Sequence, residues 1–280
     1  MLNWSVPTPL DYFATLVQSD EQLPLLEAAI SIAQDAYPEL DLQQVLAEVD
    51  ALAAQLQRRI LPDSSLVQRL QILNRFFFEE QGFGGNRNDY YAPGNSYLNV
   101  VLETRRGIPV SLAVLWLELA RGLGLDADGV GFPAHFLVQA RVGEGRVVID
   151  PFTGQALGLG DLRARLDELS LEVLAGEPPA DQALPLSLFL QPTGARQILV
   201  RMLGNLQQLH QRQQDWQKLL PVQERLIILL PQVWTEYRNR GLVLAELGEY
   251  ERARADLQLY LQHEQQAPDR AQVQARLDAL

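Results

Sequence analysis

A change of hydrophobic period near the middle of the chain constrains the fold most. Up to residue 122, apart from an aperiodic loop at 81–94, apolar side chains recur at helical spacing between caps and breakers, which is typical of amphipathic helices. Two β-rich runs follow at 129–140 and 146–149, and the stretch 143–145 between them predicts a hairpin. A helical pattern returns over 161–174. Helices with an embedded antiparallel hairpin predict an α+β fold.

A 34-residue repeat occupies the C-terminal part of the chain, and this is the length of one tetratricopeptide helix pair. In the second copy, Gly241 leaves room for two helices to touch, Gly248 predicts the turn between them, and Tyr250 and Ala253 are expected to face the first helix. Because two copies are too few for a free-standing solenoid, we expect this segment to pack on the preceding domain. The aromatic residues at matched positions are expected in the core. The matched pairs are Leu203 and Tyr237, Asn205 and Asn239, Leu206 and Arg240, and Trp216 and Tyr250.

The predicted domain boundary lies near residue 190. Residues 1–190 are expected to form the α+β domain with its N-terminal helical region, and residues 191–280 the helical repeats. Gly176-Glu177-Pro178-Pro179 is the best linker candidate. The stretch 184–190 is compatible with one more strand returning to the sheet.

Cysteine is absent, which excludes disulfides, zinc–thiolate sites and cysteine nucleophiles together. The three histidines, His135, His210 and His263, show no pattern that would bring them together, so we expect neither a metal nor another cofactor. His210 and His263 stand beside glutamines in predicted helices and are expected at the surface.

The formal net charge of −12 argues against a nucleic-acid partner, because phosphate binding requires clustered Lys and Arg. The most apolar stretch, 109–117, ends at Glu118 and is shorter than the ~18 residues of a membrane helix. The first four residues lack the charged and apolar regions of a secretory signal. These features predict a cytoplasmic protein that binds neither nucleic acid nor a membrane.

Ser111, His135 and Asp150 form the one constellation that could carry chemistry. Ser111 falls in the first turn of a predicted buried helix, His135 in a predicted strand, and Asp150 directly after the next strand. Since antiparallel neighbours can place His135 beside Asp150, the carboxylate would fix the imidazole tautomer, as in a catalytic triad. Backbone N–H groups at the helix start would face a developing oxyanion.

The sequence around these residues resembles the transglutaminase-like core, in which a helix-start Cys, a strand His and a strand Asp form a papain-like triad. It resembles in particular the bacterial SirB family, a transglutaminase-like domain followed by tetratricopeptide repeats; a similar domain occurs in some eukaryotic F-box proteins. The resemblance covers about residues 60 to 265. It implies a transglutaminase-like (papain-type) core with a small antiparallel sheet. The motifs are Asn95-Ser96-Tyr97-Leu98, Arg106-Gly107-Ile108-Pro109-Val110-Ser111-Leu112, Leu123-Gly124-Leu125, Pro133-Ala134-His135-Phe136, Ile149-Asp150-Pro151-Phe152, Asn239-Arg240-Gly241-Leu242 and Asp256-Leu257.

Serine stands where this triad requires cysteine. A thiol with a pKa of about 8.5 can ionise near a helix N-terminus, whereas a serine hydroxyl must lose its proton to a base during attack. The missing cysteine favours a non-catalytic or weakly active scaffold that binds a protein or peptide. The alternative is a hydrolase or acyltransferase with a Ser111–His135–Asp150 triad. Each residue also has a structural interpretation: Ser111 would cap its helix, His135 would be held by Asp150, and Asp150 would turn the chain before Pro151.

Overall fold

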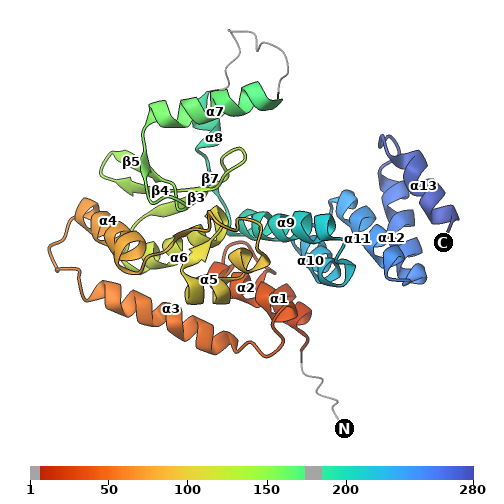
Figure 1. Ribbon diagram of the computed structural model, residues 1–280, viewed down its shortest axis with the longest axis horizontal. Coiled ribbons are helices and arrows are strands. Elements are labelled where there is room, and N and C mark those ends of the chain that lie inside the picture. Colours follow the sequence, from red (N-terminus) through yellow and green to blue (C-terminus); the bar gives the residue numbers. More distant parts are fainter. Residues whose placement is uncertain (1–6, 174–184) are drawn as a thin grey trace.

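A five-stranded antiparallel sheet lies at the centre of the N-terminal part, with helices on both faces (Figure 1). The computed structural model describes residues 7–173 and 185–280. The strand order is β6-β5-β4-β3-β7. The strands are β3 (Ala127–Val130), β4 (Leu137–Val142), β5 (Gly145–Ile149), β6 (Ala156–Leu157) and β7 (Pro192–Thr193).

The predicted α+β class is confirmed. The helices of the N-terminal part are α1 (Pro9–Leu16), α2 (Leu25–Ser31), α3 (Leu42–Gln57), α4 (Leu66–Asn74), α5 (Leu98–Thr104), α6 (Pro109–Gly122), α7 (Leu159–Val173) and α8 (Leu186–Phe189). The C-terminal helices are α9 (Ala195–Gln213), α10 (Trp216–Leu229), α11 (Trp234–Glu246), α12 (Tyr250–His263) and α13 (Arg270–Asp278). Short β1 (Gly84–Gly85) and β2 (Arg106–Gly107) pair in parallel beside the start of α6.

The alternation of side chains along β4 and β5 explains the two layers. Val138 and Ile149 are paired across the strands and belong to the large core that contains α6. Leu137 and Val148 point to the other face and pack in a smaller cluster with residues of α7 and α8. Because successive strand residues face opposite sides, one hairpin supplies apolar surface to both helical layers.

Helix α6 runs through the large core. Pro109 is its first residue, where the missing N–H costs no helical hydrogen bond, and Gly124 follows its end with a left-handed φ of 68°. Trp116 is fully buried, and its indole N–H donates to Asn74 Oδ1 at 2.9 Å. The helix therefore has a fixed position, and its first turn has a fixed position with it.

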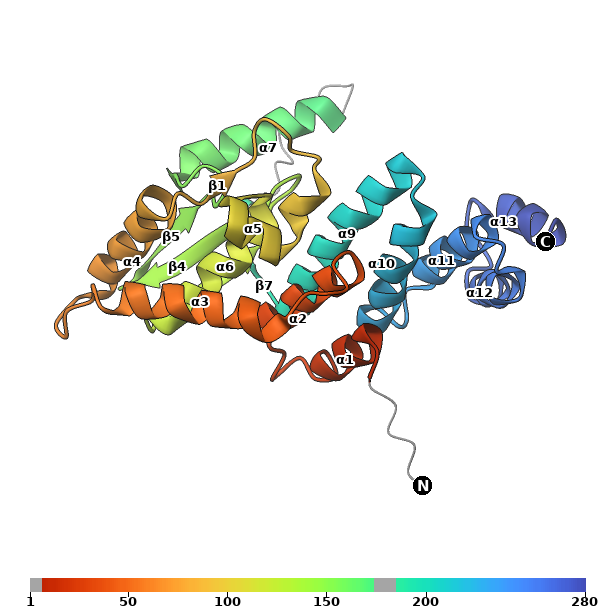
Figure 2. The same cartoon turned by 60° about the horizontal axis from the view of Figure 1, so that its bottom comes forward.

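The predicted 34-residue period of the repeat is confirmed. Helices α10 and α12 begin at Trp216 and Tyr250, 34 residues apart. Residues of α9 and α10, including Leu199 and Leu203, belong to the large core, so the first helix pair packs on the N-terminal part. Helices α11 to α13 extend away from it (Figure 2). The domain boundary at residue 190 stays a prediction.

Within the second repeat copy, the predictions for Gly241, Gly248 and Ala253 are confirmed, and the prediction for Tyr250 is wrong. A Cβ on Gly241 would lie 2.8 Å from the Leu257 side chain, so glycine allows α11 and α12 to touch. Ala253 is fully buried, but Tyr250 is 50% exposed. The core expectation for Tyr250 is therefore wrong, because the first residue of α12 lies at the end of the helix pair.

The segment predicted as one strand over 129–140 is two strands. Residues 131–136 form the connection between β3 and β4, with Ala134 at a left-handed φ of 53°. The returning strand lies at β7, and α8 occupies most of the stretch that was expected to form it. The linker candidate at 176–179 and the first four residues lie outside the described residues. In the described ranges, no helix has both the length and the apolarity to cross a membrane; the cytoplasmic location stays a prediction.

Candidate functional site

Ser111 is fully buried in the first turn of α6, and within the described parts of the chain its hydroxyl bonds to backbone groups alone. Its Oγ donates to the carbonyl of Asn95 at 2.6 Å and lies 3.0 Å from the carbonyl of Ile108. It accepts the N–H of Ile108 at 3.1 Å. The hydroxyl therefore satisfies the N–H of the residue that precedes the helix and ties this turn to the Asn95 segment.

Gly107 explains how the backbone comes so close to this hydroxyl. A Cβ at residue 107 would lie 2.7 Å from Ser111 Oγ and 3.2 Å from both Leu112 and Val101. Real Cβ atoms do not approach an oxygen so closely, so only glycine fits without displacement of the first turn.

His135 and Asp150 form a hydrogen-bonded pair beside the end of the sheet. His135 lies in the connection before β4 rather than inside a strand, and its Nε2 is 2.9 Å from Asp150 Oδ1. The imidazole is 23% exposed and the carboxylate 2%. Since Nε2–H donates to a carboxylate, Nδ1 is the acceptor nitrogen of the neutral ring. Among the described residues Nδ1 has no hydrogen-bond partner.

Asp150 accepts three hydrogen bonds from different directions. Arg165 from α7 donates to Oδ2 at 3.0 Å, and the N–H of Phe152 donates to Oδ1 at 2.9 Å. Burial alone would raise the pKa of Asp150, but the bonds from His135, Arg165 and Phe152 lower it to about 2. Its backbone carbonyl also accepts from Gly154 at 2.8 Å. Asp150 thus holds His135 and turns the chain at the same time.

The structure brings together two of the three predicted site residues by hydrogen bonding. Within residues 7–173 and 185–280, Ser111 Oγ makes no hydrogen bond to His135, because its contacts are with Asn95 and Ile108. A serine nucleophile needs a base within hydrogen-bond reach of its hydroxyl. In the observed arrangement, this hydroxyl points to the carbonyl of Asn95 instead.

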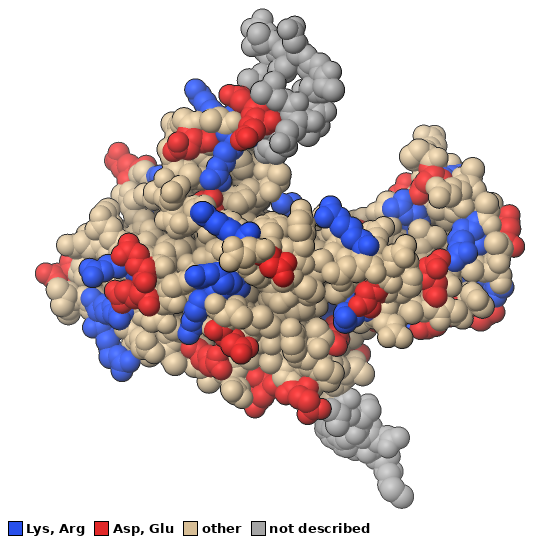
Figure 3. All heavy atoms as spheres, in the orientation of Figure 1, with Lys and Arg blue, Asp and Glu red and all other residues tan. Residues whose placement is uncertain are grey.

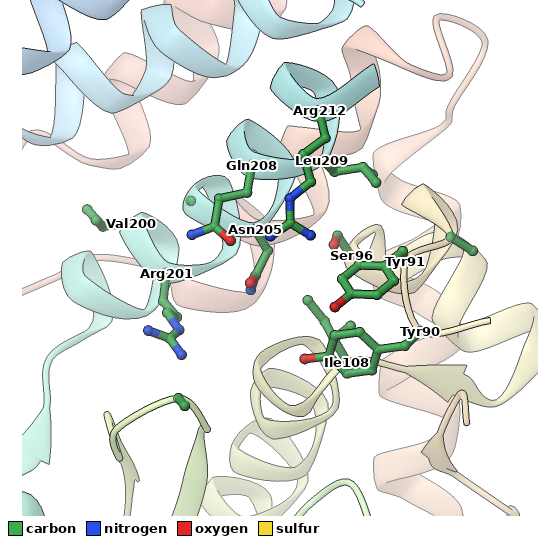
Figure 4. A pocket seen from close by; sticks show the side chains of 13 residues that line it. Tyr90, Tyr91, Ser96, Ile108, Val200, Arg201, Asn205, Gln208, Leu209 and Arg212 are labelled. Atoms are coloured by element: carbon green, nitrogen blue, oxygen red, sulfur yellow. The ribbon is translucent and has the colours of Figure 1, made fainter. Parts of the chain in front are cut away.

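A cleft of about 470 Å³ lies alongside these residues, between the N-terminal part and α9 (Figure 4). Ile108, next to the start of α6, and Ala134, next to His135, both line it. Tyr90 and Tyr91 form one wall. The opposite wall comes from one face of α9, with Val200, Arg201, Gly204, Asn205, Gln208, Leu209 and Arg212.

Asn95 links Ser111 to the tyrosine wall of the cleft. Its carbonyl accepts from Ser111, while its side-chain amide donates to the carbonyls of Asp89 and Tyr90 at 2.7 and 3.0 Å. The side-chain oxygen of Asn95 accepts from Asn86 at 3.0 Å. The Ser111 hydroxyl therefore takes part in fixing the cleft wall.

The α9 wall and the tyrosine wall were not predicted as functional. The signal was present for α9, because residues 201, 204, 205, 208 and 212 recur at the spacing of one helix face. For Tyr90 and Tyr91 the sequence shows only an aperiodic loop. Their place opposite α9 depends on how the two parts of the chain pack.

The other two histidines differ from each other. His263 is exposed as predicted and stacks on Trp234 with ring centroids 3.7 Å apart. His210 is 1% exposed, so the predicted surface position is wrong. It continues the stripe of Leu199, Leu203 and Leu206, which packs into the core. Where the structure is described, no three His, Asp or Glu side chains converge on a possible metal position.

Sequence comparisons agree with the two-part architecture. The signature of the Transglutaminase-like superfamily matches residues 43–204, and that of a tetratricopeptide repeat matches residues 206–278. A UPF0162 protein of Xylella fastidiosa is 40% identical over 87% of this chain and 85% of its own length. A UPF0162 protein of Vibrio cholerae is 26% identical over 93% of both. Human F-box only protein 21 is 28% identical over 71% of this chain and 34% of its own length. No solved structure is significantly similar.

Proposed function

Because the chain belongs to the transglutaminase-like superfamily and, within it, to the UPF0162 proteins, we propose that it is a scaffold that binds an extended protein segment in the cleft without turning it over. The bond from Ser111 Oγ to the Asn95 carbonyl carries this proposal. This bond supports a role of the hydroxyl in the wall of a binding cleft instead of in attack on a substrate. The order of the two parts supports the further proposal that the chain belongs to the SirB branch.

The surfaces around the cleft suit a protein partner. Tetratricopeptide helices present grooves to partner peptides. Tyr90 and Tyr91 are 41% and 64% exposed, and exposed aromatic side chains are frequent anchors at protein interfaces. On the face shown in Figure 3, acidic and basic side chains are interspersed, which supports the prediction that nucleic acid is not the partner.

A serine hydrolase or acyltransferase is the second candidate, and the His135–Asp150 pair favours it. Asp150 orients the ring through Nε2 and leaves Nδ1 available to a base-catalysed step. For catalysis, Ser111 Oγ would have to leave the Asn95 carbonyl and turn toward His135. The scaffold requires no such rearrangement.

Blocking the cleft tests the scaffold function. A Cβ on Gly204 meets nothing within 4 Å, so Gly204→Trp places a large ring in the cleft without a clash at its base. Gly122→Trp is the matched control, because Gly122 is also open but does not line the cleft. The ligand is a degenerate pool of fluorescein-labelled nine-residue peptides, and the readout is fluorescence anisotropy.

We expect wild type and Gly122→Trp to bind the pool equally and Gly204→Trp to bind at least about tenfold more weakly. Mass spectrometry of the recovered peptides should show no cleavage. Equal binding by both variants, or peptide cleavage that Ser111→Ala abolishes, would contradict the scaffold function.

A further inference from the structure

Two arginines of the cleft lack the carboxylate partners that most arginines of the repeat region have. Arg238, Arg240 and Arg252 each form an ion pair with Asp or Glu. Arg201 and Arg212 form none with any described residue, although the chain carries a net charge of −12. The residues lining the cleft include neither Asp nor Glu. The cleft therefore has unneutralised positive charge within an acidic protein.

The spacing of the two arginines indicates the shape of a ligand that would meet both. They lie eleven residues apart on α9, close to three helical turns, so both face the cleft about 16 Å apart along the axis (Figure 4). An extended peptide advances about 3.3 Å per residue, and its successive side chains point to opposite faces. Carboxylates four residues apart, separated by about 13 Å, therefore point to the same side, and the long arginine side chains can reach both. A small anion could contact only one of them.

The polar and aromatic groups between the arginines suit a peptide backbone. The amide side chains of Asn205 and Gln208 lie on the same face of α9 and can donate to and accept from main-chain groups. The guanidinium of Arg212 lies 5.6 Å from the ring centre of Tyr91, and Tyr90 packs edge-on against Tyr91. Arg212 is thereby held over the cleft by a cation–π contact.

We propose that the cleft selects acidic extended segments, with two carboxylates about four residues apart on the same face, through Arg201 and Arg212. This specificity rests on the proposed function, since it names the class of segment that the scaffold binds. Charge complementarity identifies the occupant of the cleft. The positive cleft attracts a negatively charged ligand, while the acidic surface elsewhere on the protein repels this ligand.

Three peptide pools test the specificity. The fluorescein-labelled nine-residue pools are degenerate except at positions 3 and 7, which carry Glu, Gln or Lys. Anisotropy titrations at low salt use the wild type, Arg201→Gln, Arg212→Gln and the double variant. Arg146→Gln is the matched control, because Arg146 is also exposed, has no ion-pair partner among the described residues and lies outside the cleft. Thermal unfolding verifies that every variant is folded.

We expect the Glu pool to bind the wild type about tenfold more tightly than the Gln pool, with each single substitution weakening binding about three- to tenfold. The double variant should bind the Glu and Gln pools alike, and added salt should remove the preference. Arg146→Gln should match the wild type.

The outcomes separate this proposal from the scaffold function. Equal binding of the Glu and Gln pools, or a preference that survives in the double variant, would overturn acidic selection while leaving a peptide-binding cleft. Binding of none of the three pools would overturn both. If the single-stranded oligonucleotide (dT)9 bound more tightly than the Glu pool, and did so through the two arginines, acidic-peptide selection would also be overturned. The cleft would then recognise phosphates rather than an acidic peptide.

Discussion

Asp150→Asn keeps the shape of the side chain but removes the negative charge to which both His135 and Arg165 bind. The pKa of Asp150 falls from 3.8 to about 2 in the folded protein. At ~1.36 kcal/mol per pH unit, this difference contributes about 2 kcal/mol to stability at neutral pH. The carboxylate is 2% exposed, so solvent screens this contribution little. We expect Asp150→Asn to lower the free energy of unfolding by about 2–3 kcal/mol at pH 7.

The stability that Asp150 contributes should decrease as the pH falls. Because the folded-state pKa is depressed, the contribution is fully present above the unfolded value of 3.8 and is lost as the pH falls toward about 2. Urea unfolding followed by circular dichroism, from pH 7 down to pH 3, should show the two proteins converging below pH 4. Asp126→Asn is the control, since Asp126 is 61% exposed in its pair with Arg141 and should cost less than about 0.5 kcal/mol. If the free energies of unfolding of Asp150→Asn and wild type differ little at pH 7, or if their difference does not shrink in acid, the Asp150 carboxylate does not stabilise the fold in this way.

Two further predictions concern residues around the same core. Gly107→Ala places a methyl group 2.7 Å from Ser111 Oγ and should lower the free energy of unfolding in urea by about 1–3 kcal/mol. Adding Ser111→Ala to the same chain should recover part of this loss. An unchanged unfolding midpoint for Gly107→Ala would contradict the close approach of residue 107 to the hydroxyl. Burial lowers the pKa of His210, and neither ring nitrogen has a hydrogen-bond partner among the described residues. The free energy of unfolding of the wild type should therefore fall by about 1 kcal/mol relative to that of His210→Leu between pH 7.5 and pH 5.5, which lies below the unfolded pKa of about 6.5. Parallel pH profiles of the free energy of unfolding for the two proteins would contradict a buried neutral imidazole.

The sequence alone predicts the features that depend on local pattern. The hairpin of β4 and β5 follows from alternation and a glycine turn, and it correctly places Asp150 after the second strand. The pairing of His135 with Asp150 follows from the antiparallel register, although His135 itself lies outside the strand. The repeat helices follow from a fixed period, which needs no knowledge of the rest of the chain.

The remaining features depend on contacts between distant segments. The bond from Ser111 to Asn95 requires the path of the loop before α5, which has no periodic signal. The direction of the Arg201 and Arg212 face depends on how α9 packs against the N-terminal part. His210 shows that one signal was missed, because it continues the apolar stripe of Leu203 and Leu206 at helical spacing.

Covalent labelling of Ser111 distinguishes a hydroxyl that stabilises the cleft wall from one that acts as a nucleophile. The full chain is incubated at pH 7.5 with a fluorophosphonate probe and analysed by intact and peptide mass spectrometry. We expect no adduct on Ser111, because the hydroxyl donates to Asn95 and none of the described residues places a base within hydrogen-bond reach of it. A Ser111 adduct that forms on the folded wild type and disappears in His135→Ala would contradict it.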